Sequence, residues 1–102
     1  MSQIINESQY NELIQNGKIV VQFSANWCGP CKVLKRSLSS MMENYNFDFR
    51  VVDVEIEREL AASKGIRSLP YVEVISAGEV KHQFTGAKPV SQLDEIFSTI
   101  FG

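Results

Sequence analysis

The two cysteines, Cys28 and Cys31, lie three positions apart in the run WCGPCK, residues 27–32. Residues three apart on a helix share one face, so their sulfurs can approach and bond. Gly29 permits a tight turn between them, and Pro30 fits a first helical turn, where its missing N–H costs nothing. A bridge over so short a loop removes little chain entropy, so the pair suits redox chemistry better than stapling of the fold.

Cys28 stands where a predicted strand ends and a predicted helix begins. Unpaired N–H groups and the helix dipole stabilise an anion there, so we expect Cys28 to be the more acidic thiol. Its thiolate would attack a substrate disulfide, and Cys31 would then attack the mixed disulfide and release the reduced substrate. Lys32 adds a positive charge that solvent largely screens. The motif therefore predicts dithiol–disulfide exchange.

A CxxC pair can also be half of a zinc site, which takes about four nitrogen or sulfur ligands. The only other soft ligand is His82, on a strand predicted to be exposed. A structural zinc site within one chain is therefore disfavoured, whereas a zinc-bridged dimer stays open. We expect no metal. We also expect no bound cofactor, because the chain has no GxGxxG or other nucleotide-binding signal.

The elements that position the pair alternate along the chain. Strands are predicted over residues 4–5, 18–24, 47–54, 71–75 and 80–85. Helices are predicted after a capping box at Asn6 and Gln9, after Cys28, over residues 57–64, and from Pro89 onward. This order predicts one α/β domain over residues 1–102, with a mixed five-stranded sheet that four helices cover on both faces.

The composition and the first residues indicate which kinds of partner and which cellular compartment to expect. The chain has 102 residues, 44% hydrophobic and 22% charged, and a net charge of −2. Nothing in this balance suggests a surface for nucleic acid or an anionic membrane. The first residues show no secretory signal, and no apolar run approaches the roughly 20 residues of a membrane span. The sequence therefore predicts a cytoplasmic protein.

At WCGPCK the sequence resembles the thioredoxin family, and the resemblance covers nearly the whole chain. Residues 23–25 and Trp27 match the family's approach to the site, and residues 66–70 match the segment with its cis-proline. Gly78 matches its hairpin turn, and Gly86 its glycine beside the substrate groove. The resemblance implies a thioredoxin fold and protein-disulfide reductase activity.

The resemblance also implies a substrate groove around the cysteines and Gly29-Pro30, formed by Trp27, Leu69, Pro70 and Gly86. Pro70 would be cis, and Leu69 would offer backbone groups to an extended substrate. From the sequence alone, Trp27 fits a core position about as well. The implied partners are disulfide-containing proteins and an NADPH-dependent flavoprotein thioredoxin reductase, with the chain itself monomeric.

Two positions depart from the family pattern. Most thioredoxins have a buried Asp where this chain has Gln22, and they tend to have Lys where Val51 stands. Gln cannot accept a proton near neutral pH, so we expect Cys31 to resolve mixed disulfides more slowly here. Glu73, inside an otherwise apolar strand, is a candidate for the missing acid. An alternative with more weight places it on a partly exposed face, because unpaired Glu is rarely buried.

Two rival functions stay open. One is an oxidase or isomerase that introduces disulfides, which the residues between the cysteines disfavour. The other is a binding module or complex subunit that keeps the thioredoxin shape with little redox turnover, and the changes at Gln22 and Val51 leave room for it.

Overall fold

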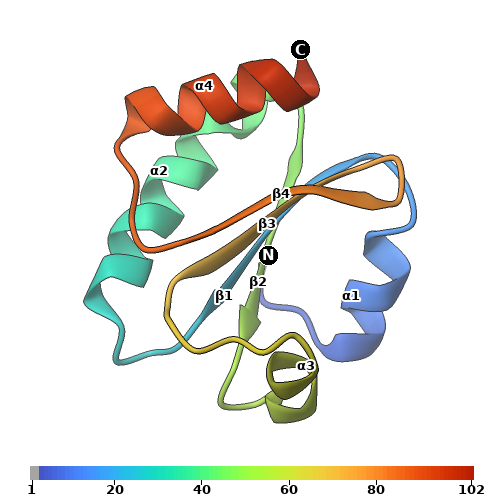
Figure 1. The fold of residues 1–102 in the computed structure, drawn as a ribbon, viewed down its shortest axis with the longest axis vertical. Helices are drawn as coiled ribbons and strands as arrows, with labels where there is room; N and C mark the ends of the chain where they lie inside the picture. The colour runs from blue at the N-terminus through green and yellow to red at the C-terminus, as the bar shows by residue number, and fades with distance from the viewer. Residues whose placement is uncertain (1–2) are drawn as a thin grey trace.

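Residues 3–102 are described by the computed structural model. In chain order the elements are α1 (Glu7–Leu13), β1 (Lys18–Ser24), α2 (Gly29–Tyr45), β2 (Asp48–Asp53), α3 (Arg58–Ser63), β3 (Tyr71–Ser76), β4 (Glu79–Thr85) and α4 (Val90–Phe101). The strands form one mixed sheet in the order β2-β1-β3-β4 (Figure 1). β1 runs parallel to β2 and antiparallel to β3, and β4 is antiparallel to β3. This is the predicted α/β thioredoxin fold, with four helices.

The prediction of five strands is wrong, because the sheet has four. The segment around residues 4–5 meets the edge strand β2 in a single parallel bridge, Ile4 to Val51. Two hydrogen bonds hold it: the N–H of Val51 donates to Gln3 O at 2.8 Å, and the N–H of Ile5 donates to Val51 O at 2.9 Å. Asn6 then caps α1, so the chain turns away from β2 before a strand can extend.

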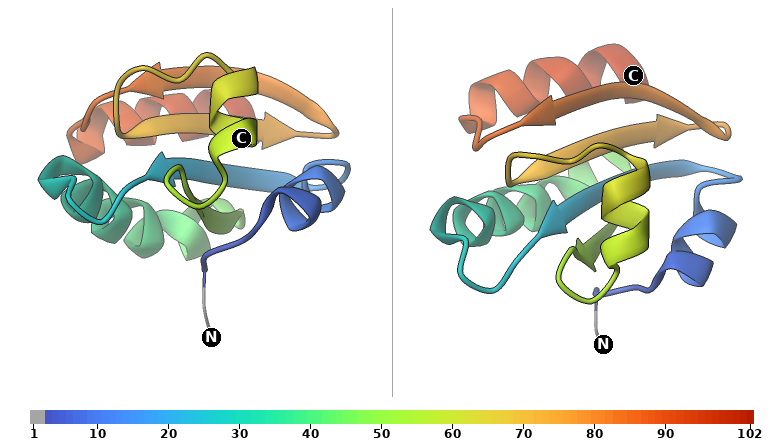
Figure 2. Two further views of the ribbon diagram at one scale, coloured as in Figure 1. Left: turned by 90° about the horizontal axis from the view of Figure 1, so that it is seen from below. Right: turned by 60° about the horizontal axis from the view of Figure 1, so that its bottom comes forward.

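Helices cover both faces of the sheet, as predicted. α2 and α4 lie on one face, and α1 and α3 on the other (Figures 1 and 2). In the first layer, Leu38 of α2 and Phe97 of α4 belong to the same buried cluster as Val20 of β1. In the second, Tyr10 of α1 and Leu60 of α3 cluster with the inward side chains of β1 and β3. Successive residues of β1 alternate between the two clusters, which is the period of a strand buried on both faces.

Local signals set the ends of several elements. The capping box at Asn6 and Gln9 is present, with both reciprocal hydrogen bonds. Ala77 and Gly78 both have positive φ, 53° and 82°, and form the two-residue loop between β3 and β4. Pro89 was predicted to lie in the first turn of the last helix, but it occupies the N-cap position of α4, one residue before the helix begins. Within residues 3–102, no helix is long and apolar enough to cross a membrane.

Candidate active site

The cysteine pair lies at the junction between β1 and α2. Cys28 is the N-cap of α2, and its Sγ accepts a hydrogen bond from the N–H of Cys31 at 3.3 Å. The two residues form a disulfide with their Cα atoms 5.3 Å apart. Both are buried, with 4% of Cys28 and 1% of Cys31 exposed, while Gly29 and Pro30 are on the surface. The helix N-terminus therefore presents N–H groups to the sulfur of Cys28, which is the environment that favours a thiolate.

Trp27 stands on the surface next to the pair. It is 70% exposed, so the alternative of a core tryptophan is wrong. Together with Leu69 it lines a cleft of about 400 Å³, and the other lining residues are Val54, Arg58, Ala61, Ala62, Ile66 and Arg67. The cleft thus joins the active-site loop to α3 and to the segment before β3. Its wall is apolar, and it carries two guanidinium groups.

Pro70 and Gly86 are brought together at the start of β3 and the end of β4. The Leu69–Pro70 peptide bond is cis, as the resemblance implied. The N–H of Gly86 donates to Pro70 O at 2.8 Å, and Gly86 has a φ of +82°, which favours glycine. Because Tyr71 pairs with Phe23, Pro70 lies beside the end of β1, where the active-site loop begins. Pro70 and Gly86 are not among the residues that line the Trp27 cleft.

Gln22 lies directly beneath the start of α2 and is completely buried. Its Nε2 donates to the carbonyl oxygen of Cys31 at 2.9 Å, whereas its Oε1 has no hydrogen-bond partner in residues 3–102. The residue beside it on β2 is Val51, also buried. The region next to Cys31 therefore holds a neutral amide and an aliphatic side chain.

A small cavity of about 130 Å³ adjoins Cys31. Its lining comprises Ile4, Ser24, Ala25, Asn26, Cys31, Lys32, Lys35, Val51 and Asp53. Asp53 was not among the predicted site residues. The sequence nevertheless contained a signal for Asp53. Parallel strands end at the same edge of a sheet, and Asp53 is the last residue of β2, paired with Ser24, the last residue of β1.

Comparison with known proteins settles the family. The family model for thioredoxin matches residues 1–99. The chain belongs to the thioredoxin family. A thioredoxin of Mycoplasmoides gallisepticum is 34% identical over 98 residues, which cover 94% of this chain and 98% of that protein. A thioredoxin of Pyropia yezoensis is 34% identical over 96 residues, with 91% and 90% covered.

Solved structures agree with this assignment. A Plasmodium falciparum thioredoxin superimposes with a TM-score of 0.84 at 27% identity, covering 95% of this chain and 97% of its own. The mitochondrial thioredoxin 3 of Saccharomyces cerevisiae, 24% identical, has the same fold, with a TM-score of 0.85. Family membership and the Cys28–Cys31 disulfide identify this thioredoxin as a thiol–disulfide oxidoreductase with protein-disulfide reductase activity.

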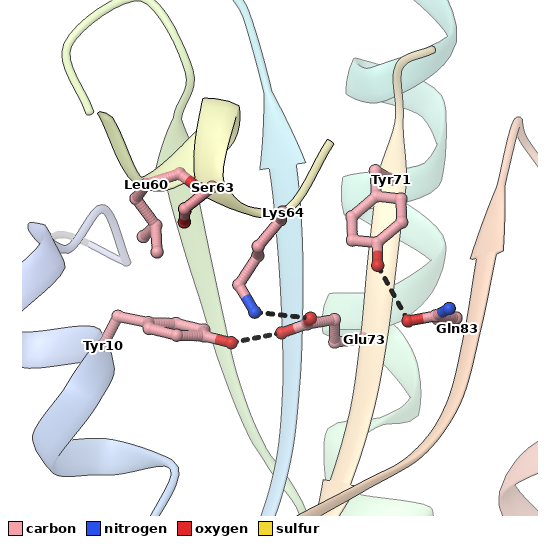
Figure 3. A network of polar contacts seen from close by, with 7 residues as sticks. All are labelled: Tyr10, Leu60, Ser63, Lys64, Tyr71, Glu73 and Gln83. Carbon is pink, nitrogen blue, oxygen red and sulfur yellow. Dashed lines mark hydrogen bonds and ion pairs between the residues drawn. The ribbon is translucent and has the colours of Figure 1, made fainter. Parts of the chain in front are cut away.

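Glu73 does not compensate for the amide at Gln22. Only 2% of Glu73 is exposed, so the prediction of a partly exposed glutamate is wrong. Its carboxylate accepts a hydrogen bond from the hydroxyl of Tyr10 and pairs with Lys64 Nζ at 2.9 Å (Figure 3). Burial, and then the hydrogen bond to Glu73, raise the pKa of Tyr10.

The alternative that Glu73 supplies the missing acid is also wrong. Glu73 pairs with Val21 across the β1–β3 ladder and shares its face of the sheet, the face covered by α1 and α3. Gln22 points the other way, toward Cys31 and α2. The sheet itself therefore separates the Glu73 carboxylate from the cysteine pair.

His82, the one histidine, is exposed on β4, as predicted. Within residues 3–102, no group of three or more His, Cys, Asp or Glu side chains is arranged to hold a metal ion.

Proposed function

We propose that Cys28 is the attacking thiolate and Cys31 the resolving thiol of a protein-disulfide reductase. The observation that carries this assignment is the position of Cys28 at the N-cap of α2, where its sulfur accepts the N–H of Cys31. In the reduced protein the same N–H groups would stabilise the Cys28 thiolate, which attacks one sulfur of a substrate disulfide. Cys31 lies one helical turn further on and then attacks Cys28 Sγ, which releases the substrate thiolate.

The same proposal places the substrate along Trp27, Leu69, Pro70 and Gly86, with Gly29 and Pro30 beside the reacting sulfurs. Within residues 3–102 the backbone N–H and carbonyl of Leu69 make no hydrogen bond, so they are available to an extended peptide. The exposed ring of Trp27 shares its cleft with Leu69. These features support binding by backbone pairing together with contact to one apolar side chain.

Partners and setting form part of the proposal and rest on the family resemblance. Residues 1–102 act as one domain, as a monomer in the cytoplasm, on disulfide-containing proteins. An NADPH-dependent flavoprotein thioredoxin reductase returns the electrons after each turnover.

A second candidate is a thioredoxin-like binding module with little turnover. The observation that favours it is the neutral pair of Gln22 and Val51 beside Cys31, which leaves the resolving thiol without an adjacent acid. A Cys28→Ser protein that keeps every function in the cell would support this candidate over the reductase.

The test is catalysed reduction of insulin with NADPH and a thioredoxin reductase as the electron source. We expect turnover by the unmodified protein and none by Cys28→Ser. The variant Cys31→Ser should form the mixed disulfide and then stall. Absence of turnover even with a chemical dithiol as donor would contradict the reductase assignment, because the donor then needs no matching reductase.

A further inference from the structure

One acidic residue at the cavity beside Cys31 has no role in the exchange mechanism proposed above. It is Asp53, one of the residues that line the cavity together with Cys31 itself and with Lys32 and Lys35 of α2. Both β1 and β2 run toward this edge of the sheet, where α2 begins (Figure 1). Side chains on one face of a strand recur every second residue, so Asp53 lies on the same face as Val51, the face that α2 covers.

We propose that Asp53 accepts the proton of the Cys31 thiol through water held in this cavity, a step that rests on the exchange function proposed above. A volume of about 130 Å³ holds several waters. The side chains of Ser24, Asn26 and Asp53 give such waters hydrogen-bond partners. The buried neighbours Gln22 and Val51 are uncharged, and Asp53 is the carboxylic acid among the residues that line this cavity.

The step balances as an ordinary exchange. In the mixed disulfide, Cys28 Sγ is bonded to the substrate sulfur, and Cys31 carries a proton. That proton passes through water to the Asp53 carboxylate while Cys31 Sγ attacks Cys28 Sγ. The Cys28–Cys31 bond forms, the bond to the substrate breaks, and the substrate leaves as a thiolate that takes a proton from solvent.

Asp53 is held in place by the turn that leads to α3. Its Oδ1 accepts the N–H of Glu55 at 2.8 Å, and its backbone oxygen accepts the N–H groups of Ile56 at 3.2 Å and Glu57 at 2.8 Å. A carboxylate has further lone pairs on both oxygens, so this contact leaves acceptor capacity for water. The turn therefore positions the Asp53 carboxylate and leaves its oxygens able to accept hydrogen bonds from water.

The charged and titratable groups around the cavity are few. β2 contributes Asp53, and α2 contributes Cys31, Lys32 and Lys35. The side chains from the N-terminal segment and from the end of β1 with its following loop carry no charge. The two ammonium groups cannot accept a proton from Cys31, and their charge favours the thiolate that Asp53 helps to form.

Asp53→Asn is the first test, because an Asn oxygen can still accept the N–H of Glu55 while the amide cannot take a proton. The measurement is the single-turnover release of a labelled thiol from the mixed disulfide with Cys28. We expect release near neutral pH to slow by about 10-fold or more, toward the scale of general-base contributions. Formation of the mixed disulfide should stay unchanged. Asp48→Asn, the same change at the far end of β2, should alter neither rate.

The unmodified protein gives a second test that needs no variant. With Asp53 as acceptor, the release rate should be nearly independent of pH from about pH 6 to about pH 8, because the rate then no longer follows the thiolate fraction of Cys31. A rate that follows the thiolate fraction instead, dropping about tenfold per pH unit below pH 8, would overturn the proposal. So would an Asp53→Asn protein that folds and releases substrate at the unmodified rate. Neither result bears on the exchange function, which is tested separately by formation of the mixed disulfide and by turnover with a chemical dithiol.

Discussion

Gln22 stands where the resemblance to the family implies a buried Asp. A neutral amide with one good hydrogen bond is cheaper to bury than an unpaired carboxylate, and Val51 beside it offers no countercharge. The amide Oε1 has no hydrogen-bond partner among the protein atoms of residues 3–102. We infer that the position trades direct proton acceptance from Cys31 for stability.

Replacing Gln22 by Asp should reverse that trade. An acid next to Cys31 should speed release of the mixed disulfide, because the proton then needs no water-filled route. The free energy of unfolding should fall by about 3 kcal/mol at neutral pH, since the buried carboxylate has no partner. Single-turnover release and urea unfolding measure the two effects.

Two further variants separate the effect of the negative charge in Gln22→Asp from the effect of changing the side chain. Gln22→Asn alters the length of the side chain but adds no charge, so it should not speed release. Adding Val51→Lys to Gln22→Asp should recover part of the lost stability, with a coupling of about 1 kcal/mol or more between these neighbours on β1 and β2. An unchanged release rate in Gln22→Asp would show that Cys31 deprotonation does not limit this step.

At the scale of elements, the carboxylate of Glu73 connects two helices to the sheet. Tyr10 reaches it from α1, and Lys64 reaches it from the residue that ends α3 (Figure 3). α3 has only six residues, and no side chain caps its N-terminus, so it depends on tertiary contacts. Because α3 forms one wall of the Trp27 cleft, the network also connects that wall to the sheet.

Lys64→Met should therefore destabilise the fold by about 3 kcal/mol, because it leaves the buried Glu73 carboxylate without its countercharge. Urea unfolding measures the change. The double variant Lys64→Met/Glu73→Gln should regain much of the loss, since no buried charge then remains. Lys81→Met, which breaks the exposed pair with Glu79, is the matched control and should cost no more than about 1 kcal/mol. Equal effects at the two lysines would contradict the role given to the network.

Sequence patterns located most elements because their signals are local. The strand over residues 18–24 is bounded by Gly17 and by the active-site loop, and the structure has it at Lys18–Ser24. The prediction of a first strand over residues 4–5 was wrong, because the length of that segment depends on where Asn6 starts α1. Glu73 was misplaced because its partner Tyr10 lies 63 positions away, and only the assembled sheet brings them together. Asp53 was missed although the parallel pairing of β1 and β2 brings it beside Ser24, because the cavity that these residues share with Cys31 forms only in the folded chain.

At the scale of the whole molecule, the sheet divides the interior into two clusters with different tasks. The cluster under α2 and α4 supports the cysteine pair through Gln22 and through the packing of α2. The cluster under α1 and α3 contains Tyr10 and surrounds the Glu73 network. Loss of the Tyr10 proton should therefore affect global stability, whereas the proton transfer that we propose beside Cys31 should affect the rate of exchange.

The stability of the whole chain should fall as pH rises above about 10. The pKa of Tyr10 is raised above its ordinary value of 10.0, chiefly by burial and then by the hydrogen bond to Glu73. Above that pH the unfolded chain loses the tyrosine proton while the folded protein keeps it, so deprotonation favours unfolding. The contribution of this one group is about 1.4 kcal/mol per pH unit.

Tyr10→Phe isolates this contribution, because every other titrating group is left in place. The variant should be less stable at neutral pH by about 1.5–3 kcal/mol, the value of a hydrogen bond to a charged group. Above about pH 10 its free energy of unfolding should decline less steeply than that of the unmodified protein, so the two curves converge. Urea unfolding at a series of alkaline pH values measures both slopes. Parallel curves would mean that the Tyr10 hydroxyl titrates alike in the folded and unfolded chains, and that burial against Glu73 does not hold its proton.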